Sequence, residues 1–368
     1  MGVKCSEIFR YMEQIAPPWL AEDWDNIGLM VGNRENEVNK VLVCLDVTLK
    51  VAVEAIEKKA GLIISHHPVI FKGIKNIDES KPLGKLLCSL IRNNITVYAA
   101  HTNLDIADDG VNECLGRTLG LNDMEVLDET GFEKLYKLAV FVPEDKAEDV
   151  REAVCAEGAG FIGNYSDCTF MSKGTGTFKP QQGANPYIGT ENILEKVNEV
   201  KIETIVPESR LQRVISAMLK AHPYEEVAYD VYLLNAKGKR YGLGKVGLIE
   251  KPMEFKEFAS MVKNALNIKN IRYTGTPPQA VKKVAVFCGS FDDSLIPIIK
   301  NKADVLVTGD LKHHTALDLV AAGICAIDAG HFATERIIVS EIARKLTEQF
   351  KNLEVIISEN DEEPLYVL

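Results

Sequence analysis

The stretch "KVLVCLDVTLKVAVEAIEKKAGLIISHH", residues 40–67, has the pattern of a strand, a helix and a second strand. Short apolar runs at 40–46 and 61–67 flank a helical pattern at 48–60. This alternation is typical of a parallel sheet, in which the helix connects two neighbouring strands. The second strand stops at two adjacent histidines, His66 and His67. A pair of polar rings at the end of a buried strand is the first indication of a functional site.

The same order of elements occurs twice along the chain. A third strand at 94–105 follows a helical pattern at 81–94, and a second series of three strands lies near the C-terminus, at 283–289, 303–314 and 323–331. In each series the second strand ends near a histidine pair and the third ends near a single histidine: His66–His67 and His101 in the first, His313–His314 and His331 in the second. We interpret the two series as similar α/β halves of one core domain, although βαβ units resemble one another in general.

The middle of the chain has a different repeat. Residues 137–154 and 201–218 each contain a strand, a Val-Pro-Glu triplet that ends it, and an amphipathic helix. Further strand patterns follow both, so two β-α-β units predict a ferredoxin-like domain. We therefore expect an inserted ferredoxin-like α+β domain at 128–245 and a discontinuous core at 1–127 and 246–368. The loop 176–189, rich in Gly, Pro, Gln and Asn, is expected to be a flexible excursion.

Composition narrows the class of protein. With a net charge of −11, the chain is not expected to present a broad basic surface for nucleic acid. No apolar run reaches the length of about 18 residues needed to span a membrane. The eight cysteines form no CxxC pair, and several lie within apolar runs, so we expect buried thiols and a reducing, cytoplasmic location.

Five candidate groups follow strands of the predicted parallel sheets, where ligands bind in such folds. They are His66, His67, His101, Asp105 and His331. In "DAGHFATE", residues 328–335, His331 and Glu335 stand four residues apart at the start of a helix, which places both on one face. The candidate metal ligands have three imidazoles and two carboxylates, a set that suits Zn, Fe, Mn or Co better than Ca or Mg. They are His66, His67, His331, Asp105 and Glu335. His66 and His67 would diverge toward two neighbouring ions, with the carboxylates joining or balancing them.

Other interpretations of these residues remain open. A lone histidine more often caps backbone carbonyls than binds metal, and the case for ligation depends on the combination. His101, His313, His314, Asp310 and Asp328 fit either orientation of the ligands or a structural role at strand ends. For Asp46, which ends the first strand, we expect a helix cap. The segment His222-Pro223-Tyr224-Glu225-Glu226 fits a ligand site, but a turn between helix and strand is the simpler interpretation.

Five blocks of sequence together resemble the Nif-three-like family, also called GTP cyclohydrolase type 2 homologs. They are "AEDWDNIGLMVGN" (21–33), "SHHPVIFKGIKNI" (65–77), "YAAHTNLDIADDGVNECLG" (98–116), "VLVTGDLKHH" (305–314) and "DAGHFATE" (328–335). "HPYEEVAYDVY" resembles the inserted domain of the longer bacterial members, which is similar to PII and CutA modules. The resemblance implies a dinuclear metal centre held by His66, His67, Asp105, His331 and Glu335, in a toroidal homohexamer.

The family label also implies an activity: attack of metal-bound hydroxide on C8 of GTP, with release of formate. In that reaction His101 is the candidate proton shuttle. No P-loop or guanine-reading motif identifies GTP independently. A two-metal site suits a phosphoesterase equally well, and a non-catalytic metal-binding or regulatory scaffold is the third alternative.

Overall fold

The computed structural model describes residues 2–366 and is a mixed α/β fold with several sheets, as the sequence predicts. It divides into two compact units. Unit 1 contains the chain up to Thr130 and from Gly242 onward, and unit 2 is Gly131–Tyr241. Two long strands, β7 (Leu121–Pro143) and β10 (Tyr229–Met253), run through the unit boundaries and contribute residues to both.

Unit 1 contains a five-stranded sheet of order β15-β4-β5-β6-β2. Its strands are β2 (Gly28–Val31), β4 (Lys40–Cys44), β5 (Leu62–Ser65), β6 (Thr96–Ala99) and β15 (Glu354–Ile357). β15, β4, β5 and β6 are parallel, and β2 pairs antiparallel with β6. Because β15 comes from the C-terminal segment, the sheet of the first series is completed by residues far away in sequence. A separate two-stranded pair joins β1 (Val3–Lys4) and β3 (Glu37–Val38).

The second series forms another sheet in unit 1, with the order β11-β14-β13-β12 followed by parts of β10 and β7. Its remaining strands are β11 (Arg272–Thr274), β12 (Val281–Ser290), β13 (Val305–Gly309) and β14 (Cys325–Asp328). β12, β13 and β14 are parallel, whereas β11 and β10 are antiparallel to their neighbours. Each series of the sequence therefore contributes three consecutive parallel strands.

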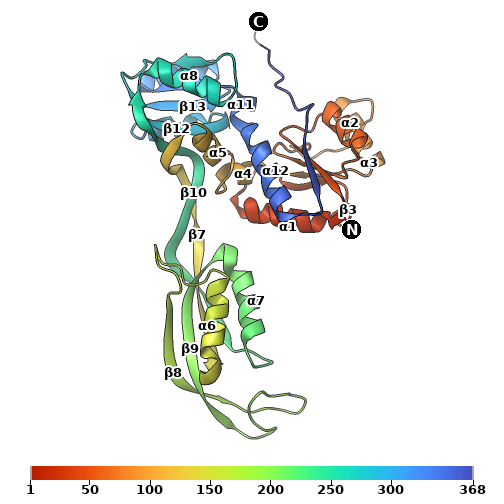
Figure 1. Cartoon of the computed structure of the whole chain (residues 1–368), viewed down its shortest axis with the longest axis vertical. Helices are drawn as coiled ribbons and strands as arrows, with labels where there is room; N and C mark the ends of the chain where they lie inside the picture. Colours follow the sequence, from red (N-terminus) through yellow and green to blue (C-terminus); the bar gives the residue numbers. More distant parts are fainter. Residues whose placement is uncertain (1, 367–368) are drawn as a thin grey trace. The chain divides into compact units, whose positions relative to one another are not determined.

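Helices connect these strands and close the cores. They are α1 (Cys5–Ile15), α2 (Leu49–Glu57), α3 (Pro82–Arg92), α4 (Thr102–Ile106), α5 (Val111–Thr118), α8 (Phe255–Ala265), α9 (Ile296–Ile299), α10 (His313–Ala322), α11 (His331–Glu335) and α12 (Ile337–Gln349). α2 and α3 lie together beside the first sheet, and α12 contacts β15 and β4 (Figure 1). Among residues 2–366, no helix has both the length and the apolar character required to cross a bilayer.

Unit 2 has the chain order β7, α6 (Ala147–Ala156), β8 (Thr169–Phe178), β9 (Glu195–Pro207), α7 (Leu211–Ala221) and β10. Its sheet order is β10-β7-β9-β8, and β9 pairs antiparallel with both β7 and β8. α6 and α7 pack side by side against this sheet, as Figure 1 shows. Their apolar faces bury Val150, Val154, Val214 and Met218 against strand residues such as Ile202.

The carboxylate of Glu54 connects α2 to the segment after β15. Glu54 is 3% exposed and accepts hydrogen bonds from Ser358 Oγ at 2.6 Å and from the backbone N–H of Glu359 at 3.0 Å. Lys58 and Asn360 also donate to it. Burial opposes ionisation, but these donors outweigh it and lower the pKa of Glu54 to about 2.

We expect Glu54→Gln to lower the free energy of unfolding of unit 1 by about 2–3 kcal/mol at pH 7. Since the folded-state pKa is depressed, this contribution is present above the ordinary pKa of 4.5 and disappears as the pH falls toward 2. Urea denaturation followed by tryptophan fluorescence reports unit 1, because both tryptophans, Trp19 and Trp24, lie there. The matched control is Glu57→Gln, an exposed residue on the same helix. A difference that stays constant from pH 7 to pH 3 would contradict this account.

Candidate metal centre

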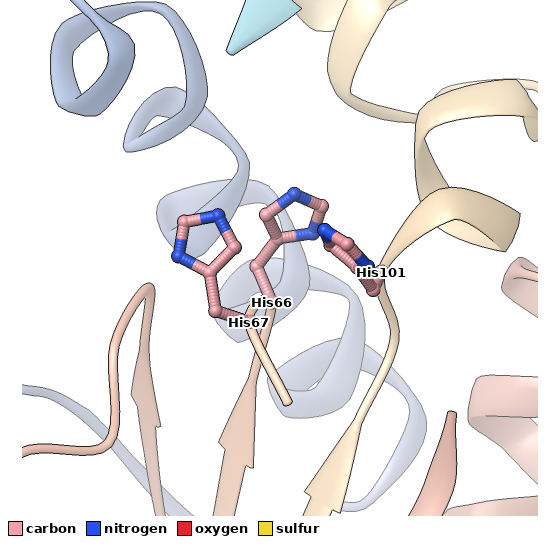
Figure 2. Close-up of side chains that lie close together, drawn as sticks. All are labelled: His66, His67 and His101. Atoms are coloured by element: carbon pink, nitrogen blue, oxygen red, sulfur yellow. The ribbon is translucent and has the colours of Figure 1, made fainter. Parts of the chain in front are cut away.

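His66 and His67 leave the end of β5 in different directions. Ser65 is the last strand residue, and its hydroxyl donates to the carbonyl of His67 at 2.8 Å, which turns the chain. His66 is fully buried, and His67 is only partly exposed. The two rings lie 5.0 Å apart between centroids, and His101, at the end of β6, approaches His66 to 5.2 Å. Figure 2 shows the three rings around one space at the carboxyl ends of these strands.

Four histidines are anchored through the same ring atom, Nδ1, each to an oxygen 2.8–2.9 Å away. The pairs are His66 with the carbonyl of Ala100, His67 with Asp46 Oδ1, His101 with Asp25 Oδ1, and His331 with Asp310 Oδ2. Because carbonyl and carboxylate oxygens only accept, each Nδ1 carries the hydrogen. A neutral ring then has its lone pair on Nε2. This is the arrangement found in metal-ligating histidines, whose second nitrogen donates to a carbonyl or carboxylate.

Two carboxylates, a buried one on Glu335 and a partly buried one on Asp105, face these Nε2 atoms. Asp105 lies on α4, and its Oδ1 is 3.5 Å from Nε2 of His66. Glu335 lies on α11, and its Oε2 is 3.0 Å from Nε2 of His67 and 2.9 Å from Nε2 of His331. The last pair confirms that residues 331 and 335 share one helix face. Gly289, at the end of β12, leaves room for Glu335, since a Cβ at that position would lie 2.1 Å from Glu335 Oε1.

The ligand atoms form three overlapping groups, each of which could hold a metal ion. In each group the candidate ligand atoms lie within 4.8 Å of one another: His66, His67 and His101; His67, His331 and Glu335; and His66, Asp105 and Glu335. The structure thus brings together all six residues singled out from the sequence. It also places His101, the candidate proton shuttle, among the possible metal ligands.

The surroundings of Glu335 favour positive charge on its partners. Burial disfavours protonated His67, yet hydrogen bonds to Asp46 and Glu335 raise the pKa of His67 to about 10. The hydrogen bond to Glu335, opposed by burial, raises the pKa of His331 to about 9. Glu335 is itself buried, but His331 and His67 hold its pKa well below the usual range.

His66 and Asp105 shift toward their neutral forms. Burial is the main reason that the pKa of His66 falls to about 3. Burial and the nearby charge of Glu335 raise the pKa of Asp105 to about 7. A neutral imidazole is the form that binds a metal, and a bound cation would favour the ionised form of Asp105.

Two buried atoms test whether this donor set suits a metal. Nε2 of His66 is buried without a hydrogen-bond partner. The same holds for Oε2 of Glu335 when the imidazoles that face it, those of His67 and His331, are neutral. In that state the lone pairs of His67 and His331 point at Oε2, which is unfavourable without a cation between them. Either protons or metal ions can supply the missing positive charge, and they compete for the same lone pairs. The residues therefore fit a site for metal cations.

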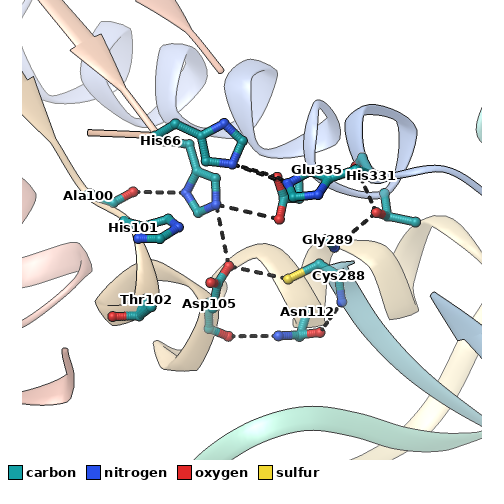
Figure 3. A network of polar contacts seen from close by, with 12 residues as sticks. His66, Ala100, His101, Thr102, Asp105, Asn112, Cys288, Gly289, His331 and Glu335 are labelled. Atoms are coloured by element: carbon teal, nitrogen blue, oxygen red, sulfur yellow. Dashed lines mark hydrogen bonds and ion pairs between the residues drawn. The ribbon is translucent and has the colours of Figure 1, made fainter. Parts of the chain in front are cut away.

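Polar contacts fix the floor of the site (Figure 3). The Asn112 side chain donates to the carbonyl of Asp105 at 3.1 Å and accepts from the backbone N–H of Cys288 at 2.9 Å. Burial raises the pKa of the Cys288 thiol, which donates to Asp105 Oδ1 at 3.2 Å. These bonds connect α4, α5 and β12, so residues from the two α/β series hold Asp105 jointly.

The residues for which the sequence left a structural role open lie in different surroundings. Asp310 anchors His331, whereas His313 and His314 begin α10 as exposed residues outside the three metal-binding groups. Asp328 pairs with Arg272 and accepts from the backbone of Gly330. The prediction that Asp46 caps a helix is wrong: Thr48 caps α2 through Val51, and Asp46 holds His67. Because Thr48 caps α2, the carboxylate of Asp46 is available to accept a hydrogen bond from His67.

Asp25 holds His101 and was not among the candidates from the sequence; Asn112 and Cys288, which hold Asp105, were not either. The fully buried side chain of Asp25 accepts from His101 Nδ1 and from the backbone and hydroxyl of Thr102. Burial opposes ionisation, but these bonds lower the pKa of Asp25 to about 2. Asp25 lies in a loop without strand or helix periodicity. Its place in "AEDWDNIGLMVGN" was the available signal, but that block gave no role for a particular residue.

Comparison with known proteins gives matches over the whole chain. Residues 3–364 match the family model described as Duf34/NIF3 (NGG1p interacting factor 3). A Bacillus subtilis protein named "GTP cyclohydrolase 1 type 2 homolog" is 44% identical, with 100% of this chain and 99% of that protein covered. A Listeria monocytogenes protein of the same name is 43% identical, with 96% of each chain covered.

Solved structures have the same fold. A Bacillus cereus protein related to NIF3 superimposes with a TM-score of 0.90 at 43% identity, covering 100% of both chains. The Staphylococcus aureus protein SA1388 has a TM-score of 0.73 at 30% identity, covering 100% of this chain and 99% of the other. These similarities extend through both units.

We expect His66→Ala and Glu335→Ala each to lower the metal content per chain, because each removes a buried ligand shared by two of the possible ion positions. The measurement is elemental analysis of anaerobically purified protein, with circular dichroism to confirm folding. His313→Ala, an exposed histidine of the same unit, is the matched control and should retain the full content. Unchanged metal content in both ligand variants would overturn the site assignment.

Proposed function

The chain belongs to the Duf34/NIF3 family, and on that premise we propose that it is a metal-dependent hydrolase acting on a guanine nucleotide. The observation that carries the proposal is the convergence of four anchored histidines and two carboxylates on one space. The name of the Bacillus subtilis relative supplies the candidate substrate, GTP. The reaction proposed is hydrolytic opening of the imidazole ring of guanine, with C8 released as formate.

We propose that two divalent ions bind here, with His66, His67, Asp105, His331 and Glu335 as ligands. When bound, such ions act as Lewis acids that polarise a substrate heteroatom and make water a stronger nucleophile near neutral pH. The nitrogen-rich donor set favours Zn, Fe, Mn or Co over Mg or Ca. Asp46 and Asp310 keep the rings of His67 and His331 in the tautomer that presents Nε2 to the site.

His101 retains the role of proton carrier in this proposal. Its Nδ1 is held by Asp25, and its Nε2 is the atom left to exchange a proton with substrate or water. The ring is 15% exposed, so it connects the buried ligands with solvent. Asp25, ionised at neutral pH, supports the imidazolium that forms when Nε2 takes up a proton.

Two exposed aromatic side chains beside His101 favour a substrate with a planar ring. Trp24 is 60% exposed and Phe71 is 48% exposed, with ring centroids 5.7 Å apart. They lie 6.1 Å and 6.2 Å from the His101 ring. The Asn26 side chain donates to the carbonyl of Ile70, so the two loops that carry these rings are joined. A simple phosphate ester would leave this surface unused, whereas a purine can stack on it.

Two further features belong to the proposal. The order β-α-β-β-α-β and the sheet order β10-β7-β9-β8 support a ferredoxin-like assignment for unit 2. The toroidal homohexamer implied by the family resemblance stays a prediction, which analytical ultracentrifugation of the full chain tests directly.

We expect anaerobically purified protein containing two ions per chain to release formate from GTP, and the His67→Ala variant to release none. Formate and inorganic phosphate are measured in the same reaction. Phosphate without formate would replace the proposal with a phosphoesterase. Two ions with neither product would support a non-catalytic metal-binding scaffold and reject the hydrolase.

We expect Trp24→Ala to raise KM for GTP by about 5-fold to 150-fold, because base–aromatic stacking contributes about 1–3 kcal/mol. The metal content should stay unchanged, since Trp24 lies outside the ligand groups. Tyr273→Ala, an equally exposed aromatic residue of unit 1, is the control. An unchanged KM in Trp24→Ala would reject the stacking surface without affecting the metal site.

A further inference from the structure

A cavity of about 500 Å³ lies within unit 2, outside the metal centre. Two segments form much of its wall: residues 176–189, which are the end of β8 and the loop after it, and the turn that follows α7, which contains the His-Pro-Tyr-Glu-Glu sequence. Both segments have distinctive sequences, and neither takes part in the proposed function. Because both segments line the same cavity, we treat them as parts of one candidate binding site.

Aromatic side chains form one part of the wall, with Tyr224 at the centre. Its ring lies 5.8 Å from Phe178 and 6.2 Å from Tyr187, measured between centroids, and Phe141 completes the set. The rings meet at angles of 63° and 53° rather than stacking flat. Ring faces carry the negative part of the aromatic quadrupole, and rings tilted in this way do not cover one another's faces by flat stacking.

His222 positions Tyr224. Its Nδ1 accepts from the backbone N–H of Tyr224 at 3.1 Å, so the hydrogen lies on Nε2, which donates to the carbonyl of Phe141 at 3.0 Å. The ring is 7% exposed, and burial lowers its pKa. His222 is therefore a neutral link between the turn and β7. The histidine before Pro223 therefore fixes the position of Tyr224 in the aromatic wall.

Carboxylates form the polar part of the wall. Glu199 is half-buried, and its Oε1 accepts from the hydroxyl of Tyr224 at 3.1 Å. Gly176 makes room for this carboxylate, because a Cβ there would lie 2.1 Å from Glu199 Oε2. Glu225, Glu226 and Lys179 also line the cavity, and the ammonium of Lys201 lies 6.0 Å from the centroid of the Phe141 ring. Three carboxylates against these two ammonium groups leave a net negative charge.

We propose that this cavity binds a small organic cation with a quaternary or alkylated ammonium head. Aromatic faces attract such a cation through their quadrupoles, and desolvation strengthens the attraction. Glu199 adds a fixed opposite charge at the wall. An anionic ligand would be repelled by the three carboxylates, and a neutral apolar ligand would leave the charge of Glu199 without a counterpart. The proposal concerns unit 2 and is independent of the reaction at the metal centre.

The test is isothermal titration calorimetry of the full chain with two probes of equal shape. Choline carries a quaternary ammonium, and 3,3-dimethyl-1-butanol has carbon in place of the nitrogen and is neutral. We expect saturable binding of choline, and at least tenfold weaker binding of the neutral probe. Glu199→Gln should weaken choline binding at least tenfold, because the amide oxygen keeps the bond to Tyr224 while the charge is lost. Glu152→Gln, an exposed change on α6 outside the cavity wall, should leave it unchanged.

Three results would overturn the proposal. The first is equal affinity for choline and the neutral probe, which would make the cavity a general apolar site. The second is unchanged choline binding in Glu199→Gln with a native circular dichroism spectrum. The third is no saturable binding of choline, or of the larger benzyltrimethylammonium, with a Kd below roughly 10 mM.

Discussion

The buried carboxylate of Glu335 is the constraint on which the rest of the metal centre depends. A carboxylate at 4% exposure needs positive or hydrogen-bonding partners, because removing a charge from water costs several kcal/mol. Its partners, His67 and His331, come from different sheets of unit 1. The parallel strands of the two sheets must therefore present their carboxyl ends to each other. Gly289 preserves the space in which this happens.

The four imidazoles of the metal centre are all anchored through Nδ1, and these anchors affect the charge around the site. Three of the four anchors are carboxylates, those of Asp25, Asp46 and Asp310, so the site collects negative charge around its rim as well as at its centre. Such a site attracts cations strongly and repels a free nucleoside triphosphate. Under the proposed function, metal ions would reverse that sign locally, so metal would bind before the anionic nucleotide.

Aromatic residues close to polar groups with fixed hydrogen bonds occur in both units, with Trp24 exposed and Tyr224 half-buried. Trp24 stands next to Asp25, whose fully buried side chain is fixed to His101 and Thr102. Tyr224 stands two residues after His222, which is fixed to Phe141. In each case the polar anchor restrains the backbone beside an aromatic residue before any ligand arrives, which reduces the entropic cost of binding. The charge beside the rings differs, with proposed metal ions in unit 1 and carboxylates in unit 2.

The sequence by itself determined the features that depend on local periodicity. The alternation of strands and helices, the shared face of His331 and Glu335, and the polar residues that follow β5 and β6 all result from neighbours within a few residues. Partners distant in sequence were decided only by the tertiary structure. Asp46 could not be told from a helix cap, because capping and anchoring both require a carboxylate just after a strand. Asp25 and β15 reach their partners across 76 and more than 300 residues, and only packing of the core brings such groups within hydrogen-bonding distance.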